Sequence, residues 1–290
     1  MRACVRGNRT HARFTMGVQK LTFTVAITVI SRACSLRDRA LGRVGRFAAG
    51  AAPQPAARHA IPSGGGLLDA VHVRPGDGPP RAALLICHGI GETVEHWRPV
   101  QNLLAAQGIA SLVFDYSGYG RSKGAVDWSQ CEQDAIAAFA FLRALEPGAP
   151  ASLLGFSLGS GIATAIVERT GPERLVLCAA FTSFRDAACS MGVPRRCAVV
   201  LPPIWSGEGP LRRCRIPVLI VHGERDRTFP VQMASQLADW GGRNAELVVV
   251  PNHAHNEPFY RPRLAYWGHV VAHLAPVEAP CSAAGVAAEA

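Results

Sequence analysis

The stretch Ala151-Ser-Leu-Leu-Gly155-Phe156-Ser157-Leu158-Gly159 decides the fold. Its first six residues are a mostly apolar run with the length of a buried strand, and Leu158–Arg169 has helical length and spacing. Glycines lie two residues before and two residues after Ser157, where small residues let a strand and a helix approach closely. The stretch therefore predicts a strand that turns sharply at Ser157 into a helix.

The same alternation of short apolar runs and longer helical patterns extends over most of the chain. Strands are predicted at Ala82–Cys87, Ile109–Phe114, Ala151–Phe156, Arg174–Ala179, Pro217–Val221 and Glu246–Val250. Helices are predicted at Trp97–Gln107, Ser129–Leu145, Leu158–Arg169, Val231–Trp240 and Arg263–Leu274. Strands that are apolar throughout are typical of a parallel sheet with helices on both faces. The fold class predicted is thus α/β, with a doubly wound and mostly parallel sheet.

Two regions depart from this alternation. Val71–Val73 and the glycine-rich stretch before it are expected to add antiparallel strands at the edge of the sheet. Residues 182–215 contain prolines, Trp205 and several basic residues without a regular period. We interpret residues 182–215 as a short cap over one end of the sheet.

Charge is distributed unevenly along the 290 residues. The net charge is +9, and residues 1–56 alone hold ten basic residues against one acidic residue, Asp38. The remainder is neutral, so no broad basic surface is expected and nucleic acid is excluded as a partner. The apolar content of 49% excludes a wholly disordered chain, and no apolar run reaches the ~20 residues of a membrane span.

The domain is expected to occupy residues 57–276. Residues 1–56 are interpreted as a disordered basic leader, whose Ala- and Pro-rich end from Ala48 to Pro62 is interpreted as a linker. Residues 277–290 are Ala-rich and are predicted to form a flexible tail. A secretory signal over residues 16–34 is the alternative, but an arginine stands where a small residue should precede cleavage, so a cytoplasmic location is expected.

Three side chains form a candidate catalytic set. A serine hydroxyl needs a base to accept its proton, and the usual base is a histidine oriented by a carboxylate. Such sets follow the chain order serine, acid, histidine when the serine lies on a sharp strand-to-helix turn. Asp226 and His255 follow two successive predicted strands after Ser157, at the edge where parallel sheets form their sites. The sequence therefore predicts Ser157 as nucleophile, Asp226 as acid and His255 as base.

Neighbouring residues compete for two of these roles. His253 is an alternative base, although Ala254 is small and Asn256 can hold the loop, which favours His255. Glu224 is an alternative acid, but its side chain lies nearer the strand end and has to turn back. Asp186, after an earlier strand, is a further alternative acid.

The loop His88-Gly-Ile90-Gly-Glu92 follows the first parallel strand. Its glycines let backbone N–H groups point into a site, so the N–H groups of Ile90 and Leu158 are predicted to form an oxyanion hole. His269 and His273 lie four residues apart without the glutamate of a zinc-binding helix, so no metal and no cofactor are expected.

The nine cysteines contain no C-x-x-C pair, which argues against a zinc ribbon or a redox pair. Cys189, Cys197 and Cys214 fall in one region, so pairing among them stays open. The segment Asp115-Tyr-Ser-Gly-Tyr-Gly-Arg-Ser122 lacks the spacing of a phosphate loop and is interpreted as a structural turn.

These motifs together resemble the α/β-hydrolase superfamily, over roughly residues 60–275. The set includes His88–Glu92, Asp115–Ser122, Gly155–Gly159, His222–Asp226 and His255-Asn256, and it is similar to monoacylglycerol lipase-like and serine aminopeptidase-like hydrolases. The sequence departs from that pattern at Ala254, where glycine often precedes the histidine. A short cap also puts long-chain lipid specificity in doubt.

The resemblance implies a serine hydrolase that cleaves a carboxylic ester or thioester through an acyl-enzyme on Ser157. Its expected partner is a small-molecule ester or acyl substrate, and the sequence indicates no oligomeric state. An acyltransferase or an aminopeptidase-like amide hydrolase with the same three residues is the alternative. A non-catalytic binding protein on this fold is a third hypothesis, although such proteins usually lose one of the three residues.

Overall fold

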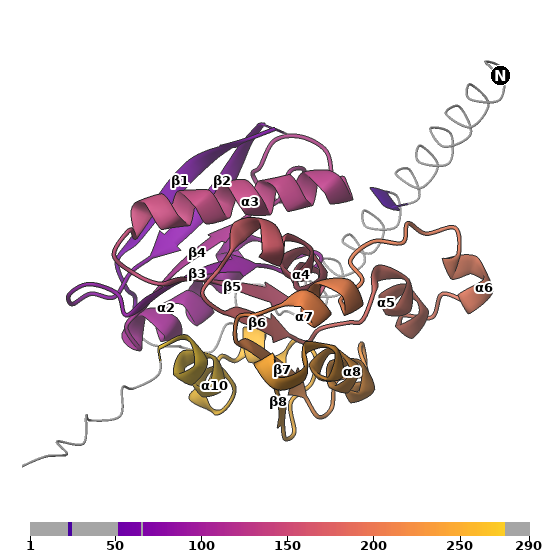
Figure 1. The fold of residues 1–290 in the computed structure, drawn as a ribbon. Coiled ribbons are helices and arrows are strands. Elements are labelled where there is room, and N and C mark those ends of the chain that lie inside the picture. The colour runs from indigo at the N-terminus through magenta and orange to yellow at the C-terminus, as the bar shows by residue number, and fades with distance from the viewer. Residues whose placement is uncertain (1–22, 25–51, 65, 276–290) are drawn as a thin grey trace, which may run out of the picture.

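A sheet of eight strands within the described residues organises the protein (Figure 1). The computed structural model describes residues 23–24, 52–64 and 66–275. The strands lie in the order β1-β2-β4-β3-β5-β6-β7-β8. The pairs β1–β2 and β2–β4 are antiparallel, and all other pairs are parallel. They are β1 (Ala56–Ser63), β2 (Gly66–Val73), β3 (Ala82–Cys87), β4 (Ile109–Phe114), β5 (Ala151–Phe156), β6 (Leu175–Cys178), β7 (Val218–Gly223) and β8 (Ala245–Val250).

The central strands are apolar because both faces of the sheet are covered. Every residue of β3, β4, β5 and β7 is buried. After β4 the chain crosses back over β3 to form β5, so the direction of winding reverses at β3. The prediction of a doubly wound, mostly parallel α/β sheet is confirmed, and the reversal is the place where such sheets form binding sites.

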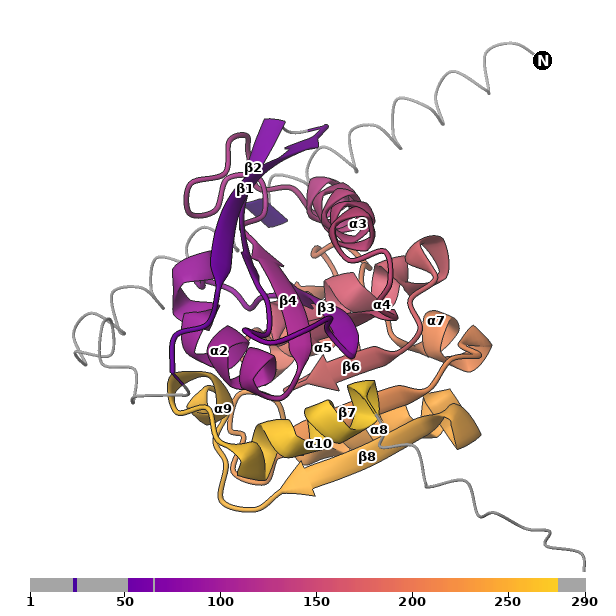
Figure 2. The same cartoon turned by 90° about the vertical axis from the view of Figure 1, so that its left-hand side faces the viewer.

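Helices cover the sheet in two layers (Figure 2). Apolar residues of α3, α4 and α8 pack on one face, and those of α2 and α10 pack on the other. The longest helix among the described residues, α3, begins where the Asp127 carboxylate accepts hydrogen bonds from two backbone N–H groups of its first turn. The bounds are η1 (Val94–Trp97), α2 (Arg98–Ala106), α3 (Trp128–Leu145), α4 (Leu158–Thr170), α8 (Val231–Gly241), η2 (Gly242–Asn244), α9 (Glu257–Tyr260) and α10 (Leu264–Leu274).

The predicted linker from Ala48 to Pro62 is in large part a strand. Residues 56–63 form β1, which pairs with β2 along its whole length and closes the antiparallel edge of the sheet. Most residues of β1 are exposed, so the strand lacks the apolar run that reveals the central strands. An edge strand also tolerates Pro62, since one of its backbone edges has no ladder to complete.

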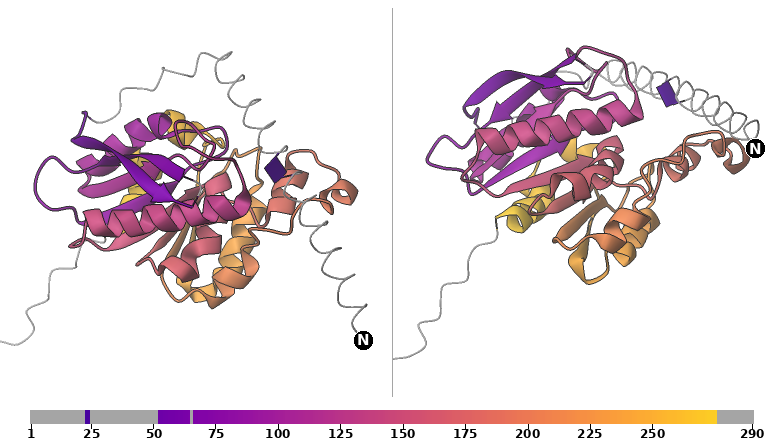
Figure 3. Two further views of the ribbon diagram at one scale, coloured as in Figure 1. Left: turned by 90° about the horizontal axis from the view of Figure 1, so that it is seen from above. Right: turned by 45° about the horizontal axis from the view of Figure 1, so that its top comes forward.

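Residues 182–215, called here the cap segment, contain three short helices: α5 (Phe184–Ser190), α6 (Arg195–Ala198) and α7 (Glu208–Arg213). The helices α5 and α6 project from the sheet on the side opposite β1 and β2 (Figure 3). Arg185 of α5 donates hydrogen bonds to the carbonyl oxygens of Val199 and Leu201, which joins the two ends of this projection.

The structure differs from the predicted disordered leader at Phe23 and Thr24. Phe23 is 1% exposed and belongs to the same core cluster as α3 and α4. The Thr24 hydroxyl donates to the carbonyl oxygen of Val126 at 3.0 Å. The other residues of the predicted leader up to Ala51, including the possible signal segment, lie outside the described residues, as does the predicted tail.

The cysteines in the described part of the chain are all free thiols, so Cys189, Cys197 and Cys214 are not paired with one another. Within the same residues, no group of three or more His, Cys, Asp or Glu side chains is arranged to hold a metal ion. Among the helices that the structure describes, none has both the length and the apolar character needed to cross a bilayer.

Candidate active site

Ser157 stands at a strained turn between β5 and α4. Its backbone has φ 50° and ψ −117°, a region that residues other than glycine rarely adopt. A Cβ atom on Gly155 would lie 2.3 Å from the carbonyl oxygen of Gly159, and one on Gly159 would lie 1.9 Å from that of Cys87. The two glycines are therefore required because the backbones touch at this point, and their contact holds the Ser157 side chain above the sheet.

Three side chains from different strand ends form a continuous series of hydrogen bonds. The Ser157 Oγ lies 3.0 Å from His255 Nε2, and the His255 Nδ1 lies 2.7 Å from Asp226 Oδ2. Ser157 follows β5, Asp226 follows β7 and His255 follows β8, so the series spans the carboxyl ends of the parallel strands from β5 to β8. The structure thus brings together the three residues that the sequence singled out.

The Asp226 carboxylate is held on both oxygens. Its Oδ1 accepts the backbone N–H groups of Thr228 and Phe229 at 2.8 and 2.9 Å, while Oδ2 faces His255. Burial alone would raise the pKa of Asp226, but the hydrogen bond and charge of His255 and the Phe229 N–H outweigh it and lower the pKa below its ordinary value. The group is consequently ionised and aimed at the imidazole.

A second histidine, His222, contacts the same carboxylate from the end of β7. It is fully buried, and its Nε2 lies 3.4 Å from Asp226 Oδ2 and 2.9 Å from the Phe229 carbonyl oxygen. Burial lowers the pKa of His222 below its ordinary value, so this ring is neutral near pH 7. Because the Phe229 carbonyl accepts, the neutral ring carries its proton on Nε2.

The competing residues take other partners. His253 Nδ1 bonds to the Pro251 carbonyl oxygen within its own loop, at 2.8 Å. Glu224 accepts the backbone N–H of Asn252 at 2.9 Å, and Asp186 accepts the hydroxyls of Thr182 and Ser183 at the start of α5. The imidazole of His255 is the one whose two nitrogens face Ser157 and Asp226.

The loop after β3 packs against the Ser157 turn. The Gly89 N–H and the Trp97 indole N–H both donate to Glu92 Oε2, at 2.8 and 2.9 Å, which gives the loop a fixed shape. The close approach of Gly159 to Cys87 joins this loop to the first turn of α4. Ile90 and Leu158 both line the cavity beside Ser157, so their backbone N–H groups lie in the two segments that meet there.

Two buried titratable groups, His88 and Asp115, contact the loop after β3. Burial lowers the pKa of His88 to about 4, and its Nδ1 bonds to the Gly89 carbonyl oxygen at 2.8 Å. Burial raises the pKa of Asp115 to about 6, although its carboxylate accepts the N–H groups of Val94 and Arg121. The segment Asp115–Ser122 therefore has the role of a structural turn, as expected from its lack of a phosphate-loop spacing.

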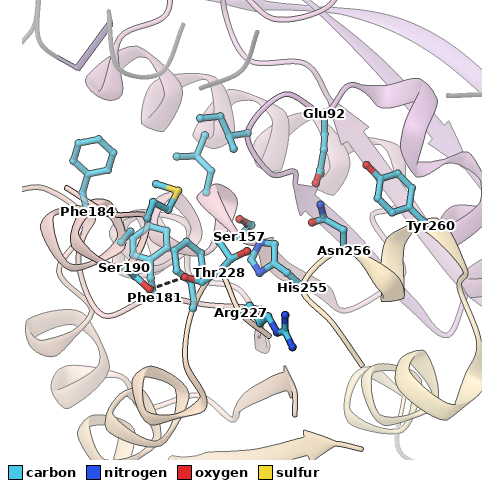
Figure 4. Close-up of a pocket in the computed structure, with 16 residues that line it drawn as sticks. Glu92, Ser157, Phe181, Phe184, Ser190, Arg227, Thr228, His255, Asn256 and Tyr260 are labelled. Carbon is cyan, nitrogen blue, oxygen red and sulfur yellow. Dashed lines mark hydrogen bonds between the residues drawn. The ribbon is translucent and has the colours of Figure 1, made fainter. Parts of the chain in front are cut away.

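A cavity of about 550 Å³ opens next to Ser157 and His255 (Figure 4). This volume lies within the range of ~300–1,000 Å³ that is common for small-molecule sites. In Figure 4, Phe181, Phe184 and Ser190 lie on one side of Ser157, and Glu92, Asn256 and Tyr260 lie on the other. The serine hydroxyl is therefore placed between an aromatic wall and a polar wall.

Sequence reasoning did not assign roles to several residues of this site. Phe181 and Phe229, whose ring centroids are 5.4 Å apart, line the cavity but come from segments without a motif. His222 and Glu92 stand inside quoted motifs, next to the predicted functional residues. Their position at strand ends was the available signal, but only the fold shows which groups they touch.

Comparisons with known proteins agree with this architecture. The family model described as "Serine aminopeptidase, S33" matches residues 78–206. A structure of ferulic acid bound to Est1E from Butyrivibrio proteoclasticus has a TM-score of 0.61 at 22% identity, covering 74% of this chain and 96% of that one. An esterase of Pyrococcus furiosus has a TM-score of 0.59 at 17% identity, with 79% and 95% covered. The chain thus has the fold of the α/β hydrolases, and its residues 78–206 match the serine aminopeptidase family model.

Curated relatives are similar over a shorter part. An uncharacterized protein of Mycobacterium tuberculosis is 30% identical over 191 residues, which cover 64% of this chain and 66% of that protein. The lysophosphatidylserine lipase ABHD12 of Macaca fascicularis is 30% identical over 176 residues, with 54% and 44% covered. The chain thus spans less than two thirds of the length of these relatives.

Proposed function

We propose that the protein is a serine hydrolase that cleaves a carboxylic ester or thioester through an acyl-enzyme on Ser157. The observation that carries the proposal is the series Ser157 Oγ, His255 Nε2, His255 Nδ1 and Asp226 Oδ2, with separations of 3.0 and 2.7 Å across the hydrogen bonds. A serine hydroxyl within hydrogen-bond reach of an imidazole that is itself oriented by a carboxylate is the arrangement that activates a weak nucleophile.

In the first half of the reaction, His255 Nε2 takes the proton of Ser157 as Oγ attacks the carbonyl carbon of the substrate. The negative charge that develops on the carbonyl oxygen is stabilised by the backbone N–H groups of Ile90 and Leu158. His255 then gives its proton to the departing alcohol or thiol as the bond to the acyl carbon breaks. The acyl group remains as an ester on Ser157.

In the second half, a water molecule takes the place of Ser157 as the nucleophile. His255 Nε2 takes a proton from water, the hydroxide attacks the acyl carbon, and the proton returns to Ser157 Oγ as the acid leaves. Asp226 holds the imidazole in the tautomer that has its proton on Nδ1 and stabilises the imidazolium form. Two backbone N–H groups on Asp226 Oδ1 keep that carboxylate oriented throughout.

The cavity supports a small ester or acyl substrate. The aromatic wall at Phe181 and Phe184 suits an apolar acyl chain, and the polar wall at Glu92, Asn256 and Tyr260 suits the alcohol that departs. Relatives named as a lysophosphatidylserine lipase and as esterases lend support to an ester as the bond that is cleaved. The mechanism needs no cofactor.

Acyl transfer and amide cleavage use the same three residues and are the second candidate, favoured by the match to a serine aminopeptidase family model. The two candidates differ in what attacks the acyl-enzyme and in which bond is cleaved. A hydrolase gives the free acid at the same rate with or without an added alcohol acceptor, whereas a transferase gives a new ester. Aminoacyl p-nitroanilides test amide cleavage directly.

The proposal is tested with p-nitrophenyl esters of graded acyl length. We expect the wild-type protein to release nitrophenolate and the Ser157→Ala variant to lose activity by roughly 10⁴- to 10⁶-fold. The matched control is Ser235→Ala on α8, whose hydroxyl bonds within its own helix, and it should retain the wild-type rate. Hydrolysis by Ser157→Ala at the wild-type rate would contradict the assignment, and would favour a non-catalytic role for this turn.

The organisation of the chain follows from this function. We propose that residues 57–276 form the catalytic domain, with the cap segment as one wall of its cavity. A cytoplasmic location is proposed because Arg32 stands where a small residue should precede cleavage of a secretory signal. Cell fractionation with an antibody against the native protein tests the location.

A further inference from the structure

An aromatic seat receives a residue that is distant in sequence from the rest of the domain. The seat consists of Trp128 at the start of α3, Phe184 at the start of α5 and Trp205 in the cap segment. The ring of Phe23 lies between them, with centroid distances of 5.4, 5.3 and 5.5 Å respectively. Phe23 is 1% exposed, so the seat is filled. In the view from above in Figure 3, Phe23–Thr24 lies between the start of α3 and the cap segment.

Phe184 links this seat to the cavity beside Ser157. Its ring contacts Phe23 and Trp205 in the seat, at centroid distances of 5.3 and 5.7 Å, and the same residue lines the cavity. The helix α5 and the turn that follows it also supply Ala187, Ser190 and Met191 to the cavity lining. The contacts of Phe184 with Phe23 and Trp205 therefore influence the position of the aromatic wall of the cavity.

The helix α5 depends on such packing for its position. It has seven residues, and a helix of that length is not stable by its own hydrogen bonds. At its start, the Phe184 N–H donates to the carbonyl oxygen of Ile204, farther along the cap segment, at 3.2 Å. Its end bonds to the loop that carries Asp226, through the Ser190 hydroxyl and the Thr228 carbonyl oxygen at 2.6 Å. The seat supports α5 at Phe184, its first residue.

We propose that Phe23 is a positioning residue that acts through Phe184 and sets the preference of the enzyme for acyl-chain length. Residues 23 and 24 are then part of the folded enzyme, although they precede β1 by more than thirty residues. The effect on acyl preference rests on the proposed hydrolase function, whereas the effect on the order of α5 does not. The two effects are measured separately for this reason.

The kinetic test compares Phe23→Ala with wild-type protein on p-nitrophenyl acetate and p-nitrophenyl octanoate. We expect the KM for octanoate to rise by about tenfold with kcat within twofold, since the aromatic wall loosens while the hydrogen-bonded series is unchanged. Both constants for acetate should stay within twofold, because a short chain does not reach the wall. Phe23→Leu keeps an apolar side chain in the seat and should show a smaller shift in the same direction.

The matched control is Phe141→Ala on α3. Phe141 packs against the same core and contacts His59 at a ring centroid distance of 5.2 Å, and it is not among the residues that line the cavity. A general loss of stability would affect both variants alike, so only an effect of the seat changes the ratio of octanoate to acetate. An unchanged ratio in both Phe23 variants would overturn the claim about acyl preference.

The structural test is amide hydrogen exchange of residues 184–190 in the full-length chain. We expect exchange in Phe23→Ala to be about tenfold faster than in wild-type protein, with exchange in β5 unchanged and with no such change in Phe141→Ala. Where Phe23→Ala does not fold, the Leu variant carries the measurement. Wild-type exchange of α5 in both Phe23 variants would overturn the seat as a support. This readout needs no activity, so it separates failure of the docking from failure of the hydrolase function.

Discussion

The strand ends that carry Ser157, Asp226 and His255 differ from the cap segment in how their atoms are held in place. At the strand ends, buried parallel strands and direct backbone contacts fix the residues, as the approach of Gly159 to Cys87 illustrates. The cap segment has helices of four to seven residues, and it exposes Val199 and Val200 to solvent by 63% and 56%. The first region is held by a continuous sheet, and the second is held by short helices, a few backbone hydrogen bonds and side-chain contacts.

This contrast assigns different tasks to the two regions. Bond cleavage needs reacting atoms held within a fraction of an ångström, and the sheet edge supplies that order. Binding of a flexible acyl chain does not require such exact placement, so the side chains that form the aromatic wall can move slightly. Substitutions at the sheet edge should therefore change the rate on every ester, while substitutions in the cap segment should change the ranking of esters.

The largest expected effect is that of Asp226→Asn. An amide cannot stabilise the imidazolium form of His255, so kcat should fall by about 10⁴-fold for acetate and octanoate alike. The matched control is Glu224→Gln, a neighbouring loop acid that bonds to the Asn252 N–H, and it should keep kcat within threefold. Steady-state kinetics on both esters measure the two variants. A decrease in kcat of less than tenfold in Asp226→Asn would show that Asp226 has no major role in catalysis.

Acid should destabilise the sheet side through its buried histidines. The pKa of His88 is lowered by burial to about 4, so its contribution to folding is complete above its unfolded pKa of ~6.5 and is lost as pH falls toward 4. At pH 4.5 the loss is about 2–3 kcal/mol for this residue. His72 and His273, also lowered to about 4 by burial, act in the same direction. Asp115, raised to about 6, opposes them, because its neutral form is favoured in the fold.

Urea unfolding at pH 7 and pH 4.5 measures this effect. The free energy of unfolding should fall between the two values of pH in the wild-type protein, and it should fall less in His88→Gln, which lacks the titrating group. Equal decreases in the two proteins would show that His88 is accessible to protons in the folded state and that the loop beneath Ile90 is looser than described.

The fold at the Ser157 turn was predictable because its determinants are local. Two glycines, an apolar run and a helical run lie within a few residues, and Ala151–Phe156 and Leu158–Thr170 form the expected strand and helix. The edge strand β1 was not predictable in this way, because its residues are held by pairing with β2 and not by an apolar pattern.

The site was predictable to the extent that it follows from chain order and strand ends. The choice of His255 over His253 depends on which imidazole the loop turns toward the serine, and that orientation is set by contacts between loops. The aromatic seat had no signal in the sequence at all, since Phe23, Trp128, Phe184 and Trp205 come from distant segments. Contacts between side chains that are far apart in sequence depend on the tertiary fold.

A smaller effect is expected in the cap segment at Met191. This residue is 44% exposed and lines the cavity, so Met191→Trp should fill part of the space for the acyl chain. We expect kcat/KM for octanoate to fall by about tenfold and that for acetate to stay within twofold. Val199→Trp adds the same bulk to the cap segment away from the cavity lining and serves as the control. A similar loss on acetate would mean that the two regions do not divide their tasks.

The smallest effect concerns cysteine reactivity, which compares the sheet with the cap segment without changing the activity of the protein. Burial raises the pKa values of Cys87 and Cys178 in the sheet to about 12, while Cys197 in the cap segment is exposed. In native protein, brief treatment with iodoacetamide should modify Cys197 well before either sheet cysteine. Peptide mass mapping after a time series measures the three rates, and equal rates would argue against a more tightly held sheet.

The most direct measurement of the central claim is covalent capture by a fluorophosphonate probe. The phosphorus stands in for the ester carbonyl carbon, so attack by an activated serine leaves a stable adduct that peptide mass mapping locates. We expect a single adduct on Ser157, formed rapidly in wild-type protein and at least a hundredfold more slowly in His255→Ala. An adduct on another residue, or rapid labelling without His255, would contradict this claim.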